Sequence, residues 1–212
     1  MVKLDILSDP ICPWCYIGKA NLDRALLEAP ANPFVLEWHP FQLNPDMEPI
    51  GMDRRDYLAA KFGGMEAVDR AEKHVSSAAE AAGVEIKWRA VPRVPNTLNA
   101  HRLIHWAGLE ARQTQVVSAL FNAYWVESRD IGDSAVLVDI AEKSGMDAAV
   151  TARLLASDAD REDIIKRDKW AREHGVSGVP TFIVANQHVV TGAQPADLWS
   201  RVIADVAAQV KS

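Results

Sequence analysis

Hydrophobic and polar positions follow two different periods along the chain, and the changes of period outline its elements. Residues 2–7 form a short apolar run with one interior aspartate, which is typical of a buried strand. In residues 12–29 the apolar side chains recur three and four positions apart, which predicts a helix that ends before Pro30. Residues 34–38 alternate again, so the start of the chain predicts a βαβ unit with parallel strands.

The middle of the chain is mainly helical, and it begins after a proline-rich loop at residues 39–52. The stretch at residues 84–95 is interrupted by two prolines, which argues against a central strand there. Glycines stand at expected helix C-caps and Asp133 at an expected N-cap. The periodicity predicts helices over residues 53–62, 65–82, 98–112, 115–127, 134–143, 147–156 and 160–174.

Strand patterns return only near the end, at residues 181–185 and 188–191, around a hairpin turn at Asn186-Gln187. A last helix is predicted from Pro195 to about Val210. Two strands at each end are too few to be stable alone, so we expect one four-stranded sheet. The sheet domain would comprise residues 1–48 and 160–212, with an all-helical insertion at residues 49–159.

Composition is that of an ordinary soluble globular protein, with 49% hydrophobic and 25% charged residues. A net charge of −6 gives no support for a nucleic-acid surface, and no apolar run is long enough to span a membrane. The first residues lack the sustained apolar core of a signal peptide, so we expect a cytoplasmic protein. In that compartment a Cys-x-x-Cys pair is more often catalytic or metal-binding than structural.

The only two cysteines, Cys12 and Cys15, are separated by Pro13 and Trp14. If Cys12 begins the predicted helix, Pro13 occupies the first turn, where its missing N–H is no loss. Unpaired N–H groups and the helix dipole then favour the Cys12 thiolate, the species that attacks a disulfide. Cys15 lies almost one turn later and can resolve the mixed disulfide. Pro13 stiffens the turn, and Trp14 adds apolar surface beside the sulfurs or packs in the core.

A zinc site is the main alternative for this pair. Zinc needs four ligands, and His101 and His105, four residues apart on one helix face, offer two more. They are distant along the chain and have no acidic base between them, so we expect redox chemistry and no metal.

Several motifs together resemble a known family. Val179 and Pro180 directly precede the third strand, and the chain contains SDPICPWCYIGK, NTLNAHRL, SRDIGD, GVSGVPTF and GAQP in that order. These motifs are similar to those of DsbA-like disulfide oxidoreductases of the FrnE-type branch. That family has an α/β thioredoxin-like fold with a helical insertion.

The resemblance implies roles for several residues and partners. Pro180 would form a cis bond facing the cysteine pair, and Val179 would offer backbone groups to an extended substrate. The substrates would be protein or peptide disulfides and thiols. No metal or organic cofactor is implied, and glutathione or another thiol would recycle the enzyme.

Relatives of this family leave a second function open. Kappa-class glutathione transferases and 2-hydroxychromene-2-carboxylate isomerases share the fold but carry serine where this chain has Cys12. Serine cannot form a disulfide, so the two cysteines favour thiol–disulfide exchange over a glutathione-dependent isomerase or transferase. A non-catalytic module that binds apolar clients is a third hypothesis.

Other candidates have two interpretations each. His101 and Arg102 are either cleft residues or a hydrogen-bonded pair on a helix surface, and Gln194 either contacts glutathione or a peptide or belongs to a simple loop. Asp5 and Glu37 lie in predicted strands, and each carboxylate is a candidate to assist proton transfer. Four tryptophans are interpreted as core residues, with an apolar groove as the alternative: Trp88, Trp106, Trp125 and Trp170.

Overall fold

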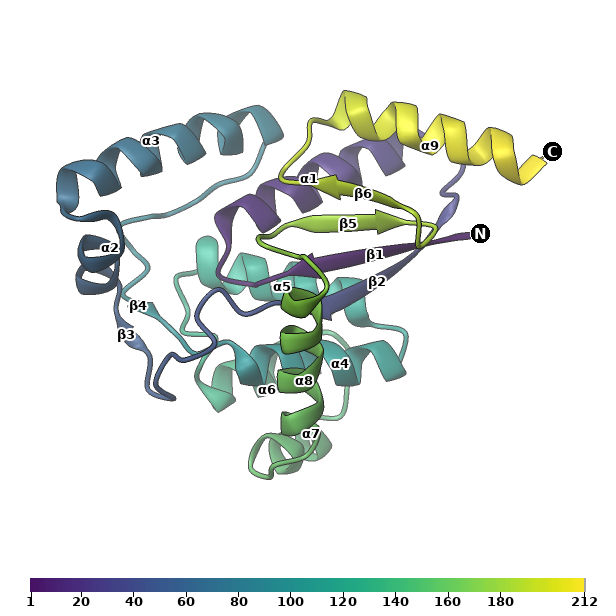
Figure 1. The fold of residues 1–212 in the computed structure, drawn as a ribbon. Coiled ribbons are helices and arrows are strands. Elements are labelled where there is room, and N and C mark those ends of the chain that lie inside the picture. The colour runs from purple at the N-terminus through teal and green to yellow at the C-terminus, as the bar shows by residue number, and fades with distance from the viewer. Residues whose placement is uncertain (212) are drawn as a thin grey trace.

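The computed structural model describes residues 1–211, and its centre is a four-stranded sheet of order β2-β1-β5-β6 (Figure 1). The strands are β1 (Val2–Ser8), β2 (Phe34–Pro40), β5 (Thr181–Val184) and β6 (His188–Thr191). β1 and β2 run parallel, whereas β5 is antiparallel to both β1 and β6. The predicted four-stranded sheet, built from both ends of the chain, is therefore confirmed.

The sheet is the middle layer of the molecule. Helices α1 (Pro13–Glu28) and α9 (Ala196–Lys211) pack together over one side of it, and α8 (Arg161–Glu173) lies on the other (Figure 1). The Phe182 ring of β5 meets the fully buried Trp199 ring of α9 at 4.7 Å between centroids. An aromatic pair of this kind fixes α9 against the sheet.

The helical region contains all of the predicted helices, with small shifts at their ends. Ala111 has φ 57°, so the helix predicted to reach residue 112 ends at Leu109. Asp133 caps its helix by accepting a hydrogen bond from the Ala135 N–H, and Gly83 follows its helix with φ 74°. The helices are α2 (Arg54–Phe62), α3 (Met65–Ala82), α4 (Leu98–Leu109), α5 (Gln113–Trp125), α6 (Ser134–Lys143), α7 (Ala148–Leu155) and α8.

Two very short strands were not predicted. β3 (Met52–Asp53) and β4 (Arg93–Val94) pair antiparallel where the sequence indicated only proline-rich loops. β3 leads directly into α2, because the Asp53 side chain accepts hydrogen bonds from the Arg55 and Asp56 N–H groups. None of the helices within residues 1–211 has the length and apolar character needed to cross a membrane.

The helical region and the sheet share one hydrophobic core, which joins Leu4 and Ile6 of β1 to Leu103 of α4 and Phe121 of α5. One side chain of α5 also pairs with the backbone N–H and C=O groups of Trp38 at the outer edge of β2. The Gln113 amide accepts from the Trp38 N–H at 2.8 Å and donates to the Trp38 carbonyl at 3.1 Å. At Trp38 this contact takes the place of a neighbouring strand.

Candidate active site

Cys12 lies at the N-cap of α1, where β1 has ended and the chain turns into the helix. The Cys12 N–H donates to the Asp9 carbonyl at 2.9 Å, and the Cys12 carbonyl accepts from the Cys15 and Tyr16 N–H groups. Pro13 occupies the first helical position, as predicted. The first turn contains no acidic side chain that would oppose a negative charge near Cys12.

Cys15 is a free thiol that lies deeper than Cys12, with 1% of its surface exposed against 4%. Burial, first of all, raises the pKa of the Cys15 thiol well above its ordinary value, and its contact with Cys12 adds to this. Hydrogen bonds from the Asp9 backbone and the Ser8 side chain act in the opposite direction. The two sulfurs therefore have unequal environments, and Cys15 retains its proton at neutral pH.

The loop before β5 faces the cysteine pair. The Val179–Pro180 peptide bond is cis, and the Cys12 Sγ lies 3.6 Å from the Val179 carbonyl oxygen. Hydrogen bonds hold this loop on both sides: Thr181 Oγ1 donates to the Gly178 carbonyl at 2.7 Å, and the Gly192 N–H donates to the Pro180 carbonyl at 2.8 Å.

α1 approaches this loop at Gly18. A Cβ atom at that position would lie 3.0 Å from the Pro180 Cγ and 3.4 Å from the Ala193 Cα. Because such contacts are closer than normal packing, the missing side chain lets α1 sit directly against the Pro180 ring. The helix that begins at Cys12 and the loop that contains Pro180 are thus positioned relative to each other by direct contact.

A cavity of about 390 Å³ opens beside Cys12. Cys12, Pro13, Trp14 and Val179 lie in its wall, whereas Cys15 does not. The opposite wall comes from α2, α3 and the end of α5, and its larger apolar side chains are Leu58, Phe62, Val68, Val75, Trp88, Tyr124 and Trp125. Such a volume and such a lining are typical of a site for an apolar ligand or side chain.

A few polar groups lie among these apolar walls. The Arg54 guanidinium is paired with Glu72 at 3.0 Å and lies over the Trp88 ring at 5.3 Å from its centroid. The His74 ring contacts the Trp14 indole at 5.4 Å between centroids. Of the tryptophans interpreted as core, Trp88 and Trp125 line the cavity, so the alternative of an apolar groove describes these two correctly.

The remaining two tryptophans lie away from this cavity. Trp106 is buried and donates to Asp160 at 2.7 Å, in agreement with a core position. Trp170 is 59% exposed and stacks on His174, so the prediction of a core residue was wrong there. It lies on the outer part of α8.

Asp9 is the residue that the sequence reasoning missed. Its carboxylate is fully buried and accepts hydrogen bonds from the Leu43 N–H at 2.6 Å, the Ile11 N–H at 3.3 Å and the Thr97 hydroxyl at 3.4 Å. Burial raises the pKa of Asp9 to about 7, although these hydrogen bonds lower it. Its position three residues before Cys12 is the sequence signal that would have identified it.

The two carboxylates proposed for proton transfer lie elsewhere. Asp5 is buried but is paired with Lys3 at 2.7 Å and His39 at 2.5 Å, and Glu37 is 43% exposed. Neither residue lines the cavity beside Cys12.

His101 and Arg102 are both buried, so the interpretation as a pair on the helix surface was wrong. His101 Nε2 lies 3.9 Å from the Asp9 carboxylate and has no hydrogen-bond partner among the described residues. Burial lowers the pKa of His101 to about 3, so its ring is neutral. His101 therefore belongs to the polar group behind the cysteines.

Arg102 has a different environment. Its guanidinium donates to the carbonyls of Leu154, Ser157 and Ala159 at 2.7–2.8 Å and to the Asn99 side chain at 2.9 Å. These contacts tie the loop between α7 and α8 to α4, which is a structural role.

Gln194 and His105 also have local contacts. The Gln194 amide donates to the Thr191 carbonyl at 2.8 Å within its own loop, and it does not line the cavity. His105 Nδ1 lies 3.3 Å from an Arg167 nitrogen. Within residues 1–211, the one group with the spacing of metal ligands is Asp5, Glu37 and His39, so the cysteines and histidines of the zinc hypothesis do not gather.

A sheet built from both chain ends, with a Cys-x-x-Cys pair at a helix start and a cis-proline loop against it, defines a thioredoxin-like protein. The chain belongs to the DSBA-like thioredoxin domain family, whose model matches residues 3–204. This confirms the predicted family and the thioredoxin-like fold with a helical insertion.

Individual proteins resemble the chain over nearly its whole length. A curated relative, the uncharacterised protein YwbO of Bacillus subtilis, is 27% identical and covers 96% of both chains. The crystal structure of a probable DsbA oxidoreductase of Streptomyces coelicolor has 27% identity and a TM-score of 0.88, covering 98% of this chain and 91% of the other.

Two more distant structures share the fold. Cytosolic disulfide reductase DsbM of Pseudomonas aeruginosa with GSH has 19% identity and a TM-score of 0.69, covering 99% of this chain and all of the other. A 2-hydroxychromene-2-carboxylate isomerase has 17% identity and a TM-score of 0.74, covering 99% and 98%. Because both kinds of protein have this fold, the fold does not by itself select the reaction.

Proposed function

We propose that this protein is a thiol–disulfide oxidoreductase in which Cys12 attacks the substrate and Cys15 resolves the product. One observation carries the proposal: Cys12 lines a cavity and lies 3.6 Å from the Val179 carbonyl, whereas Cys15 is buried behind it. One thiol in the wall of a cavity, with a second thiol behind it, is the asymmetry that a two-step exchange requires.

In the first step the Cys12 thiolate attacks one sulfur of a substrate disulfide. A bond forms between Cys12 and that sulfur, the substrate disulfide breaks, and the other substrate sulfur leaves as a thiolate that takes a proton from water. Val179 supports substrate binding through its backbone, because its N–H donates to no other group in the described part of the chain and its carbonyl faces Cys12. These are the groups that an extended peptide pairs with.

In the second step Cys15 loses its proton and attacks the Cys12 sulfur. The Cys12–Cys15 disulfide forms, the mixed disulfide breaks, and the second substrate sulfur leaves as a thiolate that takes a proton from water. We assign the proton to Asp9, because its backbone contacts the Cys15 sulfur and its carboxyl has a pKa of about 7. Such a pKa suits a general base near neutral pH.

The cycle then needs two electrons to restore the dithiol. Glutathione or another thiol supplies them in this proposal, and no metal or organic cofactor is involved. The substrates are protein or peptide disulfides, whose apolar side chains fit the aromatic cavity beside Cys12. Placement in the FrnE-type branch and a cytoplasmic location remain predictions from the sequence.

The test uses insulin reduction together with trapping of intermediates. Cys12→Ser should abolish insulin reduction, whereas Cys15→Ser should accumulate a mixed disulfide between Cys12 and the substrate. Asp9→Asn should keep the first step and slow release from the mixed disulfide by about a hundredfold, a typical contribution of a general base. Full activity in Cys12→Ser would refute the proposal.

A glutathione-dependent isomerase is the second candidate. The aromatic lining of the cavity favours it, since a flat aromatic substrate would fit beside Cys12. The isomerase and the oxidoreductase differ in what Cys15→Ser would do. An isomerase with this substitution would still turn over an aromatic substrate with glutathione, without net thiol oxidation. Protection of an aggregating client protein that survives replacement of both cysteines by alanine would instead indicate a non-catalytic binding module.

A further inference from the structure

A second cavity, of about 530 Å³, lies between the sheet and α8, and it shares no lining residue with the cavity beside Cys12. Its apolar walls come from β1, β5 and α8, through Leu7, Ile183, Ala171 and Trp170. Its size falls within the range of small-molecule sites. The residues that line it have no role in the proposed redox reaction.

The charged residues of this cavity are mostly basic. Lys3, Lys166 and Arg167 line it together with a single carboxylate, that of Asp5. Lys3 is paired with Asp5 and Glu37, so the positive charge left at the cavity wall is that of Lys166 and Arg167 on α8. A cavity lined mainly by one sign of charge concentrates ligands of the opposite sign.

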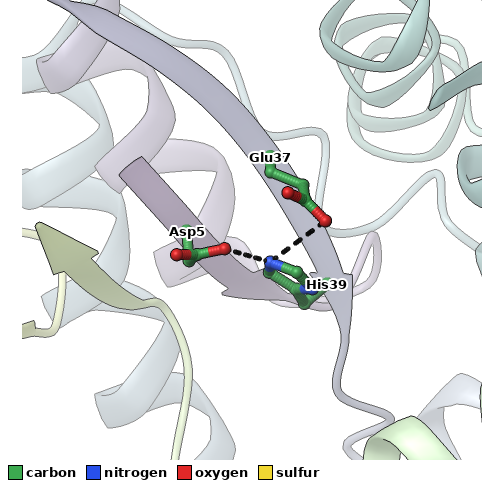
Figure 2. A group of neighbouring side chains, drawn as sticks. All are labelled: Asp5, Glu37 and His39. Atoms are coloured by element: carbon green, nitrogen blue, oxygen red, sulfur yellow. Dashed lines mark hydrogen bonds and ion pairs between the residues drawn. The ribbon is translucent and has the colours of Figure 1, made fainter. Parts of the chain in front are cut away.

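The polar cluster at the cavity wall does not fit a metal ion, although its three ligand atoms lie within 4.8 Å of one another. Figure 2 shows Asp5 on β1 pointing toward His39 and Glu37 on β2. The Lys3 ammonium already bridges the two carboxylates, at 2.7 Å from Asp5 and 2.8 Å from Glu37. A cation is thus in place between the two acids.

Both nitrogens of the His39 ring also have hydrogen-bond partners already. Arg167 donates to Nδ1 at 3.1 Å, so the proton of the neutral ring is on Nε2, which lies 2.5 Å from Asp5. Burial lowers the pKa of His39, which keeps the ring neutral. A metal at Nε2 would have to displace that proton, and Nδ1 cannot take it up because it faces the Arg167 donor.

Arg167 is only loosely paired with a carboxylate. Its two terminal nitrogens contact ring nitrogens, of His39 at 3.1 Å and of His105 at 3.3 Å. Its nearest carboxylate, that of Asp163, is 3.8 Å away and half exposed. Lys166 is paired only with the exposed Glu162, at 3.3 Å. A guanidinium held in this way at a cavity wall favours a carboxylate ligand, which it can bind through two N–H groups.

We propose that this cavity binds a small carboxylic acid with an apolar body. The carboxylate is held by Arg167 and Lys166, and the apolar body contacts Leu7, Ile183 and the Trp170 indole. The neutral His39 ring and its bond to Asp5 hold the guanidinium at the wall, so the polar cluster is a positioning device for Arg167.

The test is calorimetric titration of the full chain with 4-phenylbutyrate, with the neutral 4-phenylbutanamide as matched probe. We expect saturable binding of the acid and at least tenfold weaker binding of the amide, as for the loss of a charged hydrogen bond. Arg167→Gln should raise the Kd about tenfold, and Trp170→Ala, at an exposed position that tolerates change, should raise it severalfold.

Two lysines on the same helix provide a control. Lys166→Gln should weaken binding about threefold, whereas Lys169→Gln should leave it unchanged, because Lys169 is equally exposed but does not line the cavity. Insulin reduction should be the same in all four variants, which separates this site from the proposed active site.

Three outcomes would overturn the proposal. The first is no saturable heat at probe concentrations on the order of 1 mM. The second is equal binding of the acid and the amide. The third is a Kd that responds to Lys61→Gln, in the cavity beside Cys12, and not to Arg167→Gln, which would place the probe in the other cavity.

Discussion

The Cys12 Sγ lies 3.6 Å from the carbonyl oxygen of Val179, a residue 167 positions later in the chain. This contact joins the start of α1 to the loop that precedes β5, and the central pairing of β1 with β5 brings the two segments together. It also means that a substrate sulfur at Cys12 would lie beside the backbone of Val179.

The two thiols should differ in their reaction with an alkylating agent. Cys12 lines an open cavity, whereas Cys15 is buried and keeps its proton, so a short pulse of iodoacetamide should modify Cys12 at least about tenfold faster. Mass spectrometry of the peptide that contains both residues, in Cys12→Ser and Cys15→Ser, measures each rate separately. Equal rates would contradict the division of roles between the cysteines.

Asp9 should make stability depend on pH. Its pKa is raised to about 7 in the folded chain from 3.8, so between these values the folded state holds a proton that the unfolded state has lost. The stabilisation from this group is complete below about pH 4 and is lost as the pH rises through 7. We expect the difference in unfolding free energy, Asp9→Asn minus native, to rise with pH in this window, by at most about 1.4 kcal/mol per unit.

The measurement for Asp9 is urea unfolding of both proteins at several pH values from 4 to 8. Other titrating groups change both proteins alike, so the difference isolates Asp9. Parallel pH profiles would show that the Asp9 carboxyl titrates normally and would remove it as the proton acceptor.

Gly18→Ala should lower activity more than stability. The new methyl would press against the rigid Pro180 ring at 3.0 Å, which costs about 1–3 kcal/mol, while alanine in a helix returns up to about 1 kcal/mol. The loop that carries Val179 should shift away from Cys12, so insulin reduction should fall severalfold.

A second helical glycine serves as the control for this change. At Gly108 the added methyl meets the Gln113 side chain, which is bonded to Trp38 and lies outside the cavity beside Cys12, so Gly108→Ala should keep full activity even where it lowers stability. Unchanged activity in Gly18→Ala would mean that the spacing of α1 from the Pro180 loop does not limit the reaction.

Arg102→Met should destabilise the fold without altering the chemistry. The carbonyl of Leu154 at the end of α7 and those of Ser157 and Ala159 in the following loop would lose their donor, for an expected loss of about 3 kcal/mol. Arg102→Lys should restore part of this, because an ammonium supplies donors but not the planar fork. Thermal unfolding gives the stability, and activity at low temperature should stay near native; a large loss of activity with native stability would indicate a role at the site instead.

The sequence was sufficient for those features that depend on local pattern. Cys12 and Cys15 could be assigned because Pro13 and the helical periodicity after it place the pair at a helix start. The four strands and the intervening helices could be predicted from the period of the hydrophobic residues and from the positions of proline and glycine. The observed helix ends differ from the predicted ones by a few residues, because the residues that terminate a helix, such as Ala111 with φ 57°, carry no distinctive sequence signal.

Asp9 escaped the sequence reasoning because its importance arises from burial. Asp5 and Glu37 were the predicted candidates because they lie inside predicted strands, whereas Asp9 lies one residue after β1. The first turn of α4 covers it, and Thr97 and His101 there come from a distant part of the chain. The same burial explains why His101 and Arg102 were wrongly expected at a helix surface.

The sequence by itself determined the family, the order of the elements and the two reactive thiols, because each of these is encoded in contiguous residues. Only the tertiary structure decided which carboxyl has a raised pKa, which tryptophans face a cavity and that Arg167 lies at a cavity wall between two histidine rings. These properties depend on desolvation and on neighbours from separate elements, and both exist only once the chain has folded. The sequence fixes which reactive side chains the protein has, and the packing of the sheet and helices sets their pKa values and their neighbours.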